Sequence, residues 1–485
     1  MLIRQTSTYM IAHGTSAAFG FLSVILFTRL LTPTEYGFYV VGMGIAGIVS
    51  ALVFTWVRLS VLRFESEGDA VDIRLTALAA YAVSVAATPI VFAITVLALG
   101  VPFERAAAAV VLAVSLGLFE LGQEILRARL DAGSYMRAAV LRAVVTIGLS
   151  LAMVHLGYGG LGLVIGVAGG YLLTSVVFSG AVWRGPRKPF NRDVFSQMLR
   201  FGVPMALSGG VFALHSALDR LLVAYLLGDH AAGVYGAAAD LTRQIILFPA
   251  LSVASAVVPL AIRSLAEDGP AAADAHLTRS GELLLAVVMP AVVGLAIVAP
   301  HLAALILGPE FRVTAAELIP ILVFAWLFQT ISQQFVQVSF HLAKKPRLMV
   351  LHGAAILIVN VVAMLVLVRP FGLKGAAASL VLAEAAGVVV GYLLSRQAHP
   401  LPFAWQPIAK VVVAVVAMAV PTALIEWRGA DESIVGLATS IVTGVVIYAA
   451  AAFAIDLAGV RGALMGQIAE LRQRRADAGP RRRLI

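Results

Sequence analysis

Charged side chains inside otherwise apolar segments are the first feature of this chain that could do chemistry. One long apolar stretch carries Asp219 and Arg220, with His215 four residues before Asp219 and therefore on the same face of a helix. The next apolar stretch carries Asp240 and Arg243, three residues apart. Because charge in hydrocarbon is costly, such side chains predict a functional site with a specific partner.

These two stretches are expected to be antiparallel helices joined by a turn at Gly228–Tyr235. Arg220 lies eight residues before this turn and Arg243 eight residues after it, so both should lie roughly 12 Å below its level at 1.5 Å per residue. Together with Asp219 and Asp240 they could form one charged cluster. The cluster is either a set of salt bridges that fixes helix packing or a substrate or gating site facing a central cavity.

A ladder of polar side chains marks a later apolar segment. Gln329, Gln333, Gln337 and His341 follow one another at intervals of four residues, which places them along one stripe of a helix. Amides and imidazoles in such a row can hydrogen-bond sugar hydroxyls or a neighbouring helix. We predict that this stripe lines a cavity.

The sequence lacks the signatures of an enzyme or a cofactor protein. It contains no cysteine, no Gly-Lys dipeptide of a phosphate-binding loop, and no HExxH, GxSxG or Asp-x-Asp pattern. The scattered histidines have no metal-ligand spacing. We therefore expect no catalytic residues, no cofactor and no metal. The net charge of +9 predicts no nucleic-acid partner, because the basic residues fall in short connectors and in the C-terminal tail.

Composition defines the setting of these residues. Of 485 residues, 61% are hydrophobic and 13% charged, and the mean hydropathy is +0.96. Repeated apolar runs of about twenty residues predict an all-α polytopic membrane protein. The fourteen predicted spans are residues 8–30, 37–60, 75–99, 106–126, 138–156, 161–182, 201–227, 236–262, 281–305, 315–341, 348–368, 375–395, 408–427 and 434–456.

The distribution of Lys and Arg predicts the orientation. With a cytoplasmic N-terminus, 26 of the 35 basic residues fall in inner segments and six in outer segments. Such a bias follows the positive-inside rule. It predicts that the N- and C-termini are both cytoplasmic.

Two repeated motifs predict two related halves. The pattern L-L-x-x-x-x-x-G-x-Y occurs at Leu30–Tyr39 and at Leu226–Tyr235, and an aromatic–Gly–x–x–Gly pattern begins at Tyr158 and at Phe371. Each half has six spans, so both face the same way, as a parallel repeat. The predicted parts are an N-terminal lobe (1–183), a basic cytoplasmic linker (184–200), a C-terminal lobe (201–397), two additional helices (398–458) and a basic cytoplasmic tail (459–485).

The segments LFTRLLTPTEYGFYVVG and FGVPMALSG…LDRLLVAYLLG…AGVYGAAADL resemble the polysaccharide transporter branch of the multidrug/oligosaccharidyl-lipid/polysaccharide exporter superfamily. That branch includes bacterial O-antigen and exopolysaccharide flippases, so the resemblance implies that the chain lies in the inner membrane of a bacterium. The resemblance implies two six-helix lobes around a cavity that opens alternately to each side. It also implies that a polyprenyl-diphosphate-linked oligosaccharide moves from the inner to the outer leaflet. A polysaccharide polymerase and a chain-length regulator are candidate partners, beside membrane lipid.

The residue types fit this expectation. Guanidinium groups such as those of Arg220 and Arg243 match the geometry of phosphate oxygens, and the glutamine ladder suits sugar hydroxyls. Three alternatives stay open at this point. They are a cation-coupled drug exporter in which Asp219, Asp240, Glu120 or Glu384 titrates, a flippase for the peptidoglycan lipid precursor, and a glycan-assembly enzyme or scaffold without transport.

Overall fold

The computed structural model describes residues 2–65, 72–184, 188–402, 405–428, 433–459 and 461–462. Throughout this described part the chain is helical or forms turns, and no β-strand occurs in it. The predicted basic tail lies outside the described residues, apart from residues 459, 461 and 462. The all-α fold class is therefore confirmed.

The helices follow one another with short connections. They are α1 (Leu2–Leu30), α2 (Pro33–Val49), α3 (Thr55–Glu65), α4 (Arg74–Leu99), α5 (Phe103–Ala128), α6 (Ala132–Met153), α7 (Gly159–Val177), α8 (Ser179–Trp183), α9 (Arg192–Leu227), α10 (Asp229–Glu267), α11 (Pro270–Ile297), α12 (Ala299–Ile306), α13 (Pro309–Ile331), α14 (Gln337–Leu342), α15 (Pro346–Ser395), α16 (Trp405–Trp427) and α17 (Ile434–Ala454). Three π-helical turns are η1 (Ser50–Phe54), η2 (Val154–Tyr158) and η3 (Ser332–Val336), and η4 (Leu457–Gly459) is a 3₁₀ turn.

The number of membrane crossings agrees with the sequence. Ten continuous helical segments of the described part are long and apolar enough to span a membrane. Two of them, residues 132–177 and 346–395, are hairpins that reverse at Gly159 and Gly372, so each counts as two crossings. Helices α1 and α10, with 29 and 39 residues, are long enough to cross as well. Ten segments, two further crossings from the hairpins, and α1 and α10 give fourteen membrane crossings in the described part of the chain.

The two hairpins confirm the predicted repeat in detail. Gly159 has φ 51° and ψ −133°, and Gly372 has φ 54° and ψ −132°, so the same backbone conformation follows an aromatic residue in both halves. Glycine is the residue that adopts this region without strain. The second glycine of each motif packs closely, because a Cβ on Gly162 would lie 2.8 Å from Tyr158 Cβ and one on Gly375 would lie 2.1 Å from the Leu367 oxygen.

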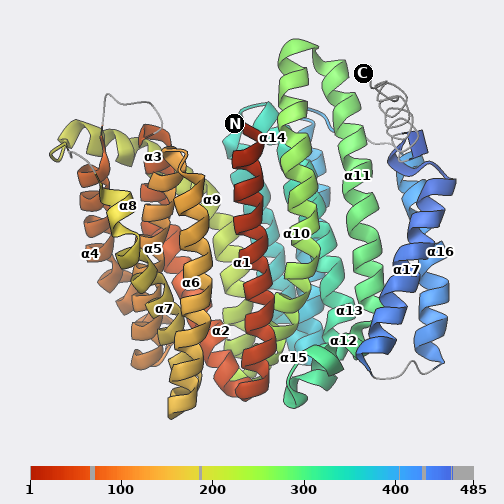
Figure 1. The fold of residues 1–485 in the computed structure, drawn as a ribbon, viewed down its shortest axis with the longest axis horizontal. Helices are drawn as coiled ribbons and strands as arrows, with labels where there is room; N and C mark the ends of the chain where they lie inside the picture. The colour runs from red at the N-terminus through yellow and green to blue at the C-terminus, as the bar shows by residue number, and fades with distance from the viewer. Residues whose placement is uncertain are drawn as a thin grey trace, which may run out of the picture.

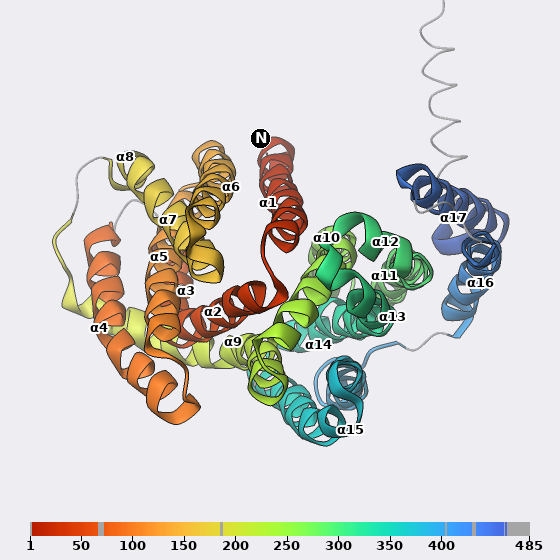
Figure 2. The same ribbon diagram turned by 90° about the horizontal axis from the view of Figure 1, so that it is seen from below.

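Figures 1 and 2 show how the elements are arranged. Seen along the helices, α2–α7 gather on one side and α10–α15 on the other, while α9 runs across from the first group to the second. Helices α16 and α17 stand at the far edge of the second group, where the Tyr448 hydroxyl donates to the Ala286 oxygen of α11 at 2.6 Å. The start of α1 and the end of α17 lie at the same end of the bundle, as an even number of crossings requires.

The two lobes meet where the two copies of the L-L-x-x-x-x-x-G-x-Y motif begin α2 and α10. We call this end, which the basic residues predict to face outward, the outer end. A Cβ on Gly37 would lie 1.9 Å from the Asp229 oxygen, and one on Gly233 would lie 1.9 Å from the Pro33 oxygen. The two glycines hold the same position in the motif. They therefore let the copies pack backbone against backbone, and we call this the outer contact.

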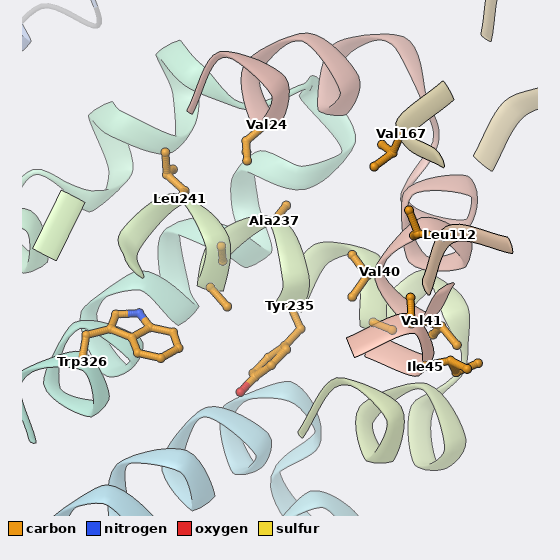
Figure 3. Close-up of a cluster of buried hydrophobic side chains, with 14 of the residues drawn as sticks. Val24, Val40, Val41, Ile45, Leu112, Val167, Tyr235, Ala237, Leu241 and Trp326 are labelled. Carbon is orange, nitrogen blue, oxygen red and sulfur yellow. The ribbon is translucent and has the colours of Figure 1, made fainter. Parts of the chain in front are cut away.

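Figure 3 shows the apolar cluster below the outer contact. Val40 and Val41 of α2 lie near Ala237 and Tyr235 of α10, with Leu112 of α5 beyond them. These side chains are at most 2% exposed, and they belong to one hydrophobic cluster that continues through both lobes. The structure is therefore closed at the outer end by apolar packing as well as by the glycine contact.

Two expected boundaries differ from the structure. The turn between α9 and α10 is Gly228 alone, with φ 86°, and α10 begins at Asp229, so the predicted turn at Gly228–Tyr235 is wrong. The segment contains no proline, and Asp229 is favourable in the first turn of a helix. Arg243 consequently lies fourteen residues into α10, about 21 Å from its start, and not level with Arg220.

The start of α9 also lies earlier than the predicted span. Asn191 caps the helix, and its Oδ1 accepts hydrogen bonds from the backbone N–H groups of Asp193 at 2.9 Å and Val194 at 3.2 Å. Residues 192–200, which the sequence analysis placed in the linker, are thus helical. This part of α9 packs on the first lobe, where Ser60 Oγ donates to the Met198 oxygen at 2.9 Å.

The close contact at Gly37 predicts a sharp effect of a single methyl group. Gly37→Ala would force α2 and α10 apart at the outer end, because overpacking of a rigid backbone contact costs about 1–3 kcal/mol. The chain has no cysteine, so Val40→Cys, at a side chain packed against Gly236 of α10, reports opening through its rate of thiol labelling. We expect Gly37→Ala to raise this rate about tenfold.

Gly47→Ala is the matched control, since a Cβ there on the same membrane span meets no atom within 4 Å. It should leave the labelling rate of Val40→Cys unchanged. Equal rates in the two alanine variants would contradict a closed outer contact at Gly37.

Candidate functional site

Arg220 and Asp240 form an ion pair between α9 and α10. The guanidinium donates to both carboxylate oxygens, through Nη2 to Oδ1 and through Nη1 to Oδ2 at 3.4 Å. Both side chains are partly exposed, at 18% and 21%. Their charges also act on the hydroxyl groups of Tyr36 and Tyr39 in α2 of the other lobe. The pair therefore stands where the two lobes face each other.

Asp219 does not join this pair. It is 5% exposed, and its Oδ2 accepts a hydrogen bond of 2.6 Å from the Tyr235 hydroxyl. Figure 3 shows the Tyr235 ring pointing away from the apolar cluster toward the pale-blue ribbon of α15. Successive residues of a helix point about 100° apart, so Asp219 enters the second lobe while Arg220 turns to Asp240. The predicted single cluster of four charges is thus divided into two sets.

The first set is a buried polar network inside the second lobe. His215 Nε2 lies 3.1 Å from Glu384 Oε1, and Gln329 Nε2 donates to the same oxygen at 2.8 Å. These three side chains are only 3%, 1% and 2% exposed. They bring together α9, α13 and the second half of α15. We call His215, Asp219, Tyr235, Gln329 and Glu384 the buried network.

Arg243 lies between the two sets. Its guanidinium carbon is 5.7 Å from the centroid of the Trp326 ring, and that indole donates to Thr242 Oγ1 at 2.8 Å. The charge of Arg243 acts on both Asp240 and Glu384. Its Nε is buried and has no hydrogen-bond partner in the described part of the chain. Arg243 thus connects the ion pair electrostatically with the buried network.

The glutamine ladder does not form one continuous face. Gln329 donates to Glu384 in the interior and is 2% exposed, and its role in lining a cavity stays a prediction. The π-helical turn η3 then interrupts the α-helical phase between Gln329 and Gln337. Gln333 is half-buried, Gln337 is 9% exposed and His341 is exposed at the end of α14. For Gln333, Gln337 and His341 the role in lining a cavity stays a prediction.

Arg142 is a site residue that the sequence reasoning missed. It lies in α6, with its guanidinium carbon 5.3 Å from the centroid of the Tyr171 ring and 5.7 Å from that of Phe119. Its charge acts on Tyr39, which Arg220 also influences from the other lobe. A guanidinium of each lobe therefore acts electrostatically on Tyr39. The available signal was its position inside the predicted span 138–156.

Arg105 and Asp229 connect the lobes at the outer end, and the sequence reasoning missed this pair too. Arg105 of α5 makes two hydrogen bonds to the Asp229 carboxylate of α10, at 2.9 and 2.6 Å. The guanidinium also stacks on Phe38 of α2 at 4.6 Å from the ring centroid. Bidentate geometry makes this pair stronger than an ordinary surface ion pair. We call it the outer clasp.

The arrangement can hold an anion more readily than a metal ion. Arg142, Arg220 and Arg243 supply cationic groups from both lobes, and tyrosine hydroxyls lie near them. Guanidinium groups bind phosphate oxygens with two hydrogen bonds. In the residues that the structure describes, no group of three or more His, Asp or Glu side chains could hold a metal ion.

Solved structures share this fold. A lipid II flippase MurJ in an inward closed conformation superposes with a TM-score of 0.73 at 14% identity, over 92% of this chain and 98% of that one. An inward-facing multidrug resistance MATE transporter of the MOP superfamily gives 0.63 at 17% identity, over 79% and 94%. A MOP superfamily transporter from Pyrococcus furiosus gives 0.58 at 16%, over 81% and 94%. No curated protein sequence matches the chain.

The fold and the charges inside its spans define a multi-pass helical membrane protein whose fold is similar to those solved structures. The family comes from the sequence itself. The model of a family described as polysaccharide biosynthesis protein matches residues 26–316, more than half of the chain. The chain belongs to this family of polysaccharide biosynthesis proteins, which confirms the resemblance stated from its motifs.

The outer clasp should help to keep the outer contact closed. Arg105→Ala should raise the labelling rate of Val40→Cys several-fold, because it leaves Asp229 without its bidentate partner and removes the stacking on Phe38. The charge-swapped double variant Arg105→Asp/Asp229→Arg should recover part of the closure.

Lys374→Ala is the control for this experiment. It breaks an exposed ion pair with Glu317 on the predicted outer side, where both side chains are more than half exposed. Such pairs contribute about 0–1 kcal/mol, so labelling should stay at the starting rate. If Arg105→Ala behaves like Lys374→Ala, the clasp does not hold the lobes together.

Proposed function

We propose that this protein is a flippase for a lipid-linked oligosaccharide of a bacterial surface polysaccharide, O-antigen or exopolysaccharide. The substrate is a polyprenyl diphosphate that carries a short glycan, and it moves from the inner to the outer leaflet. The family and the fold support this proposal. The observation that carries it is the placement of Arg142, Arg220 and Arg243 within the bundle, from both lobes.

The chemistry of each substrate part matches a part of the protein. The diphosphate is anionic, and arginine is the side chain that pairs with phosphate oxygens through two parallel hydrogen bonds. The hydroxyl group of Tyr39 and the amides of Gln333 and Gln337, which are all only partly exposed, suit the sugar hydroxyls. The polyprenyl chain can stay in the lipid, because only the head group has to avoid hydrocarbon.

Alternating access between the lobes moves the head group across the bilayer. In the structure the outer end is closed by the outer contact and the outer clasp. Opening this end and closing the opposite one would expose Arg220 and its neighbours to the outer side. We further propose that the protein lies in the inner membrane with both termini in the cytoplasm, and that a polysaccharide polymerase and a chain-length regulator use the product.

A flippase for the peptidoglycan lipid precursor is the second candidate. The fold shared with MurJ favours it, and a polyprenyl diphosphate head group would use the same arginines. The two candidates differ in the phenotype of a deletion. Loss of a surface polysaccharide with continued growth supports our proposal, whereas loss of viability supports the second candidate. Drug sensitivity without a polysaccharide defect would contradict both.

Arginine substitutions test the substrate role. We expect Arg220→Ala and Arg243→Ala to reduce polysaccharide export at least tenfold at normal protein level, because each removes a phosphate-binding group. Export is measured as surface polysaccharide in the deletion strain complemented with each variant. Arg263→Ala serves as control, since Arg263 forms an exposed ion pair with Glu267 at the end of α10.

The double variant Arg220→Asp/Asp240→Arg separates substrate binding from helix packing. If the pair only holds α9 and α10 together, the swapped charges restore export. If Arg220 binds the diphosphate, export stays low although the protein folds. Full recovery of export would therefore overturn the assignment of Arg220 to the substrate.

A further inference from the structure

A cavity lies at the end of the second lobe opposite the outer end, between α11, the end of α15 and the start of α16. We call it the inner cavity, because the basic residues predict this end to face the cytoplasm. Its volume is about 420 Å³, within the range of small-molecule sites. The wall is mainly apolar and includes Leu285, Phe335, Val388 and Ile408. Helix α16 packs on α11 and α17 and stands apart from α15 (Figure 2), which leaves this space open.

The inner cavity faces the membrane. Val389 and Leu393, which border it on α15, are 60% and 51% exposed. From Val388 to Arg396, both also in its wall, α15 runs eight residues or about 12 Å along its axis. Trp405 at the start of α16 is exposed, and tryptophan is enriched where hydrocarbon meets the head groups. The cavity therefore extends from the head-group level into the hydrocarbon of the inner leaflet.

Basic side chains lie at the mouth of the inner cavity. Arg396 belongs to the wall, and its guanidinium carbon is 5.8 Å from the centroid of the Tyr392 ring. Lys345 lies close by, because its Nζ donates to the oxygen of Gln397 at 2.5 Å. The carboxylate of Glu282, also in the wall, accepts a hydrogen bond of 2.8 Å from a backbone N–H of η4. These three charged groups together leave a net positive charge.

An apolar cavity below cationic groups matches an anionic phospholipid. Guanidinium groups bind phosphate oxygens with two hydrogen bonds. Basic pockets between membrane helices on the cytoplasmic side bind anionic head groups. A volume of about 420 Å³ accommodates one acyl chain, whereas the whole of a much longer polyprenyl chain does not fit. The chemistry therefore favours a membrane phospholipid over the lipid part of the proposed substrate.

The inner cavity also borders the π-helical turn η3. Phe335 and Val336 of this turn belong to the wall, and a Cβ on Gly281 of α11 would lie 3.0 Å from the Phe335 ring. Gln333 lies in the same turn, and Gln337 follows it directly. Single π-helical turns within α-helices are frequent at functional sites. A ligand in the cavity therefore packs against the turn that sets the direction of two glutamine side chains.

We propose that the inner cavity binds one acyl chain of an anionic phospholipid, with the phosphate on Arg396. The bound chain supports Phe335 and Val336, and it thereby holds η3 and its glutamines in one conformation. Binding does not depend on the flippase assignment. The effect of the lipid on export rests on the proposed function, because Gln333 and Gln337 are assigned there to the sugar hydroxyls.

The first experiment locates the lipid. The protein is placed in nanodiscs of phosphatidylcholine with a small fraction of phosphatidylglycerol that carries a photoreactive group on one acyl chain, and cross-linked residues are mapped by mass spectrometry. We expect cross-links at Val388 and Ile408 that excess unlabelled phosphatidylglycerol removes and excess phosphatidylcholine does not. Val446 is the internal control, because it is 60% exposed on α17 outside the cavity and should respond to both lipids alike.

Two variants test the charge and the shape of the site. Arg396→Ala should lower the cross-link yield about fivefold, the effect of one cationic group near an anionic lipid surface. Arg137→Ala is its control, since Arg137 is an exposed arginine of the first lobe whose hydrogen bonds stay within α6. Val388→Trp fills the cavity and should remove the cross-links at Ile408. Val362→Trp, at a 56% exposed position of α15 outside the cavity, should keep them.

Three results of this experiment would overturn the proposal. Equal displacement by phosphatidylcholine would mean that the cavity holds bulk lipid only. Stronger displacement by a polyprenyl phosphate than by phosphatidylglycerol would assign the cavity to the substrate chain. A full cross-link yield in both Arg396→Ala and Val388→Trp would place the lipid elsewhere.

The second experiment measures the turn η3. Hydrogen exchange of residues 332–336 should slow when phosphatidylglycerol replaces phosphatidylcholine in the wild type but not in Arg396→Ala, because a packed turn opens less often. The π-helical turn η1 of the first lobe is the control, and its exchange should not change. Exchange in η3 that ignores the lipid would overturn the coupling between the cavity and the glutamines.

A transport assay separates this proposal from the proposed function. In sealed vesicles, phosphatidylglycerol should accelerate the movement of a fluorescent polyprenyl-diphosphate oligosaccharide several-fold in the wild type but not in Arg396→Ala. Movement that is independent of the lipid composition would overturn the effect on export. If the wild type moves no substrate in any composition while the cross-links are found, the proposed function fails and the lipid site stands.

Discussion

The backbone contact between Gly37 and Gly233 is the constraint on which the rest of the structure depends. Two helices can approach this closely only where neither carries a side chain, so the contact fixes how the two lobes meet. It places Asp229 beside Arg105, which closes the outer clasp. It also sets the rotation of α10, and with it the direction in which Tyr235 and Asp240 point.

The charged side chains within the bundle form two pairs that differ in their exposure. The Arg220–Asp240 pair is about one-fifth exposed and faces α2 of the other lobe, where an anionic head group could compete for the guanidinium. The His215–Glu384 pair is buried, with side-chain exposures of 3% and 1%. One helix, α9, supplies a residue to both pairs, Arg220 to the first and His215 to the second.

The two halves share the same backbone arrangement, but they do not share the charged side chains. In the first copy of the motif, 196 residues earlier, the positions of Asp219, Arg220 and Asp240 are held by Ser23, Val24 and Gly44. The Ser23 hydroxyl donates to the Phe19 oxygen of its own helix, so this hydrogen bond does not join α1 to another helix. The charged network thus belongs to the second lobe, whereas the first lobe contributes Arg142 and the aromatic rings of α2 and α7.

The sequence by itself determined the number of crossings, the two halves and the family, because apolar run length and turn motifs act locally along the chain. It also placed the charges of α9 and α10, since charge inside a span is rare. Tertiary structure decided which charges meet. A single-residue turn at Gly228 shifted the register of α10, so Arg220 faces Asp240 while Asp219 faces Tyr235. Contacts such as Gln329 with Glu384 and Arg105 with Asp229 join residues 55 and 124 positions apart. Such pairings depend on how helices pack, and no local pattern encodes them.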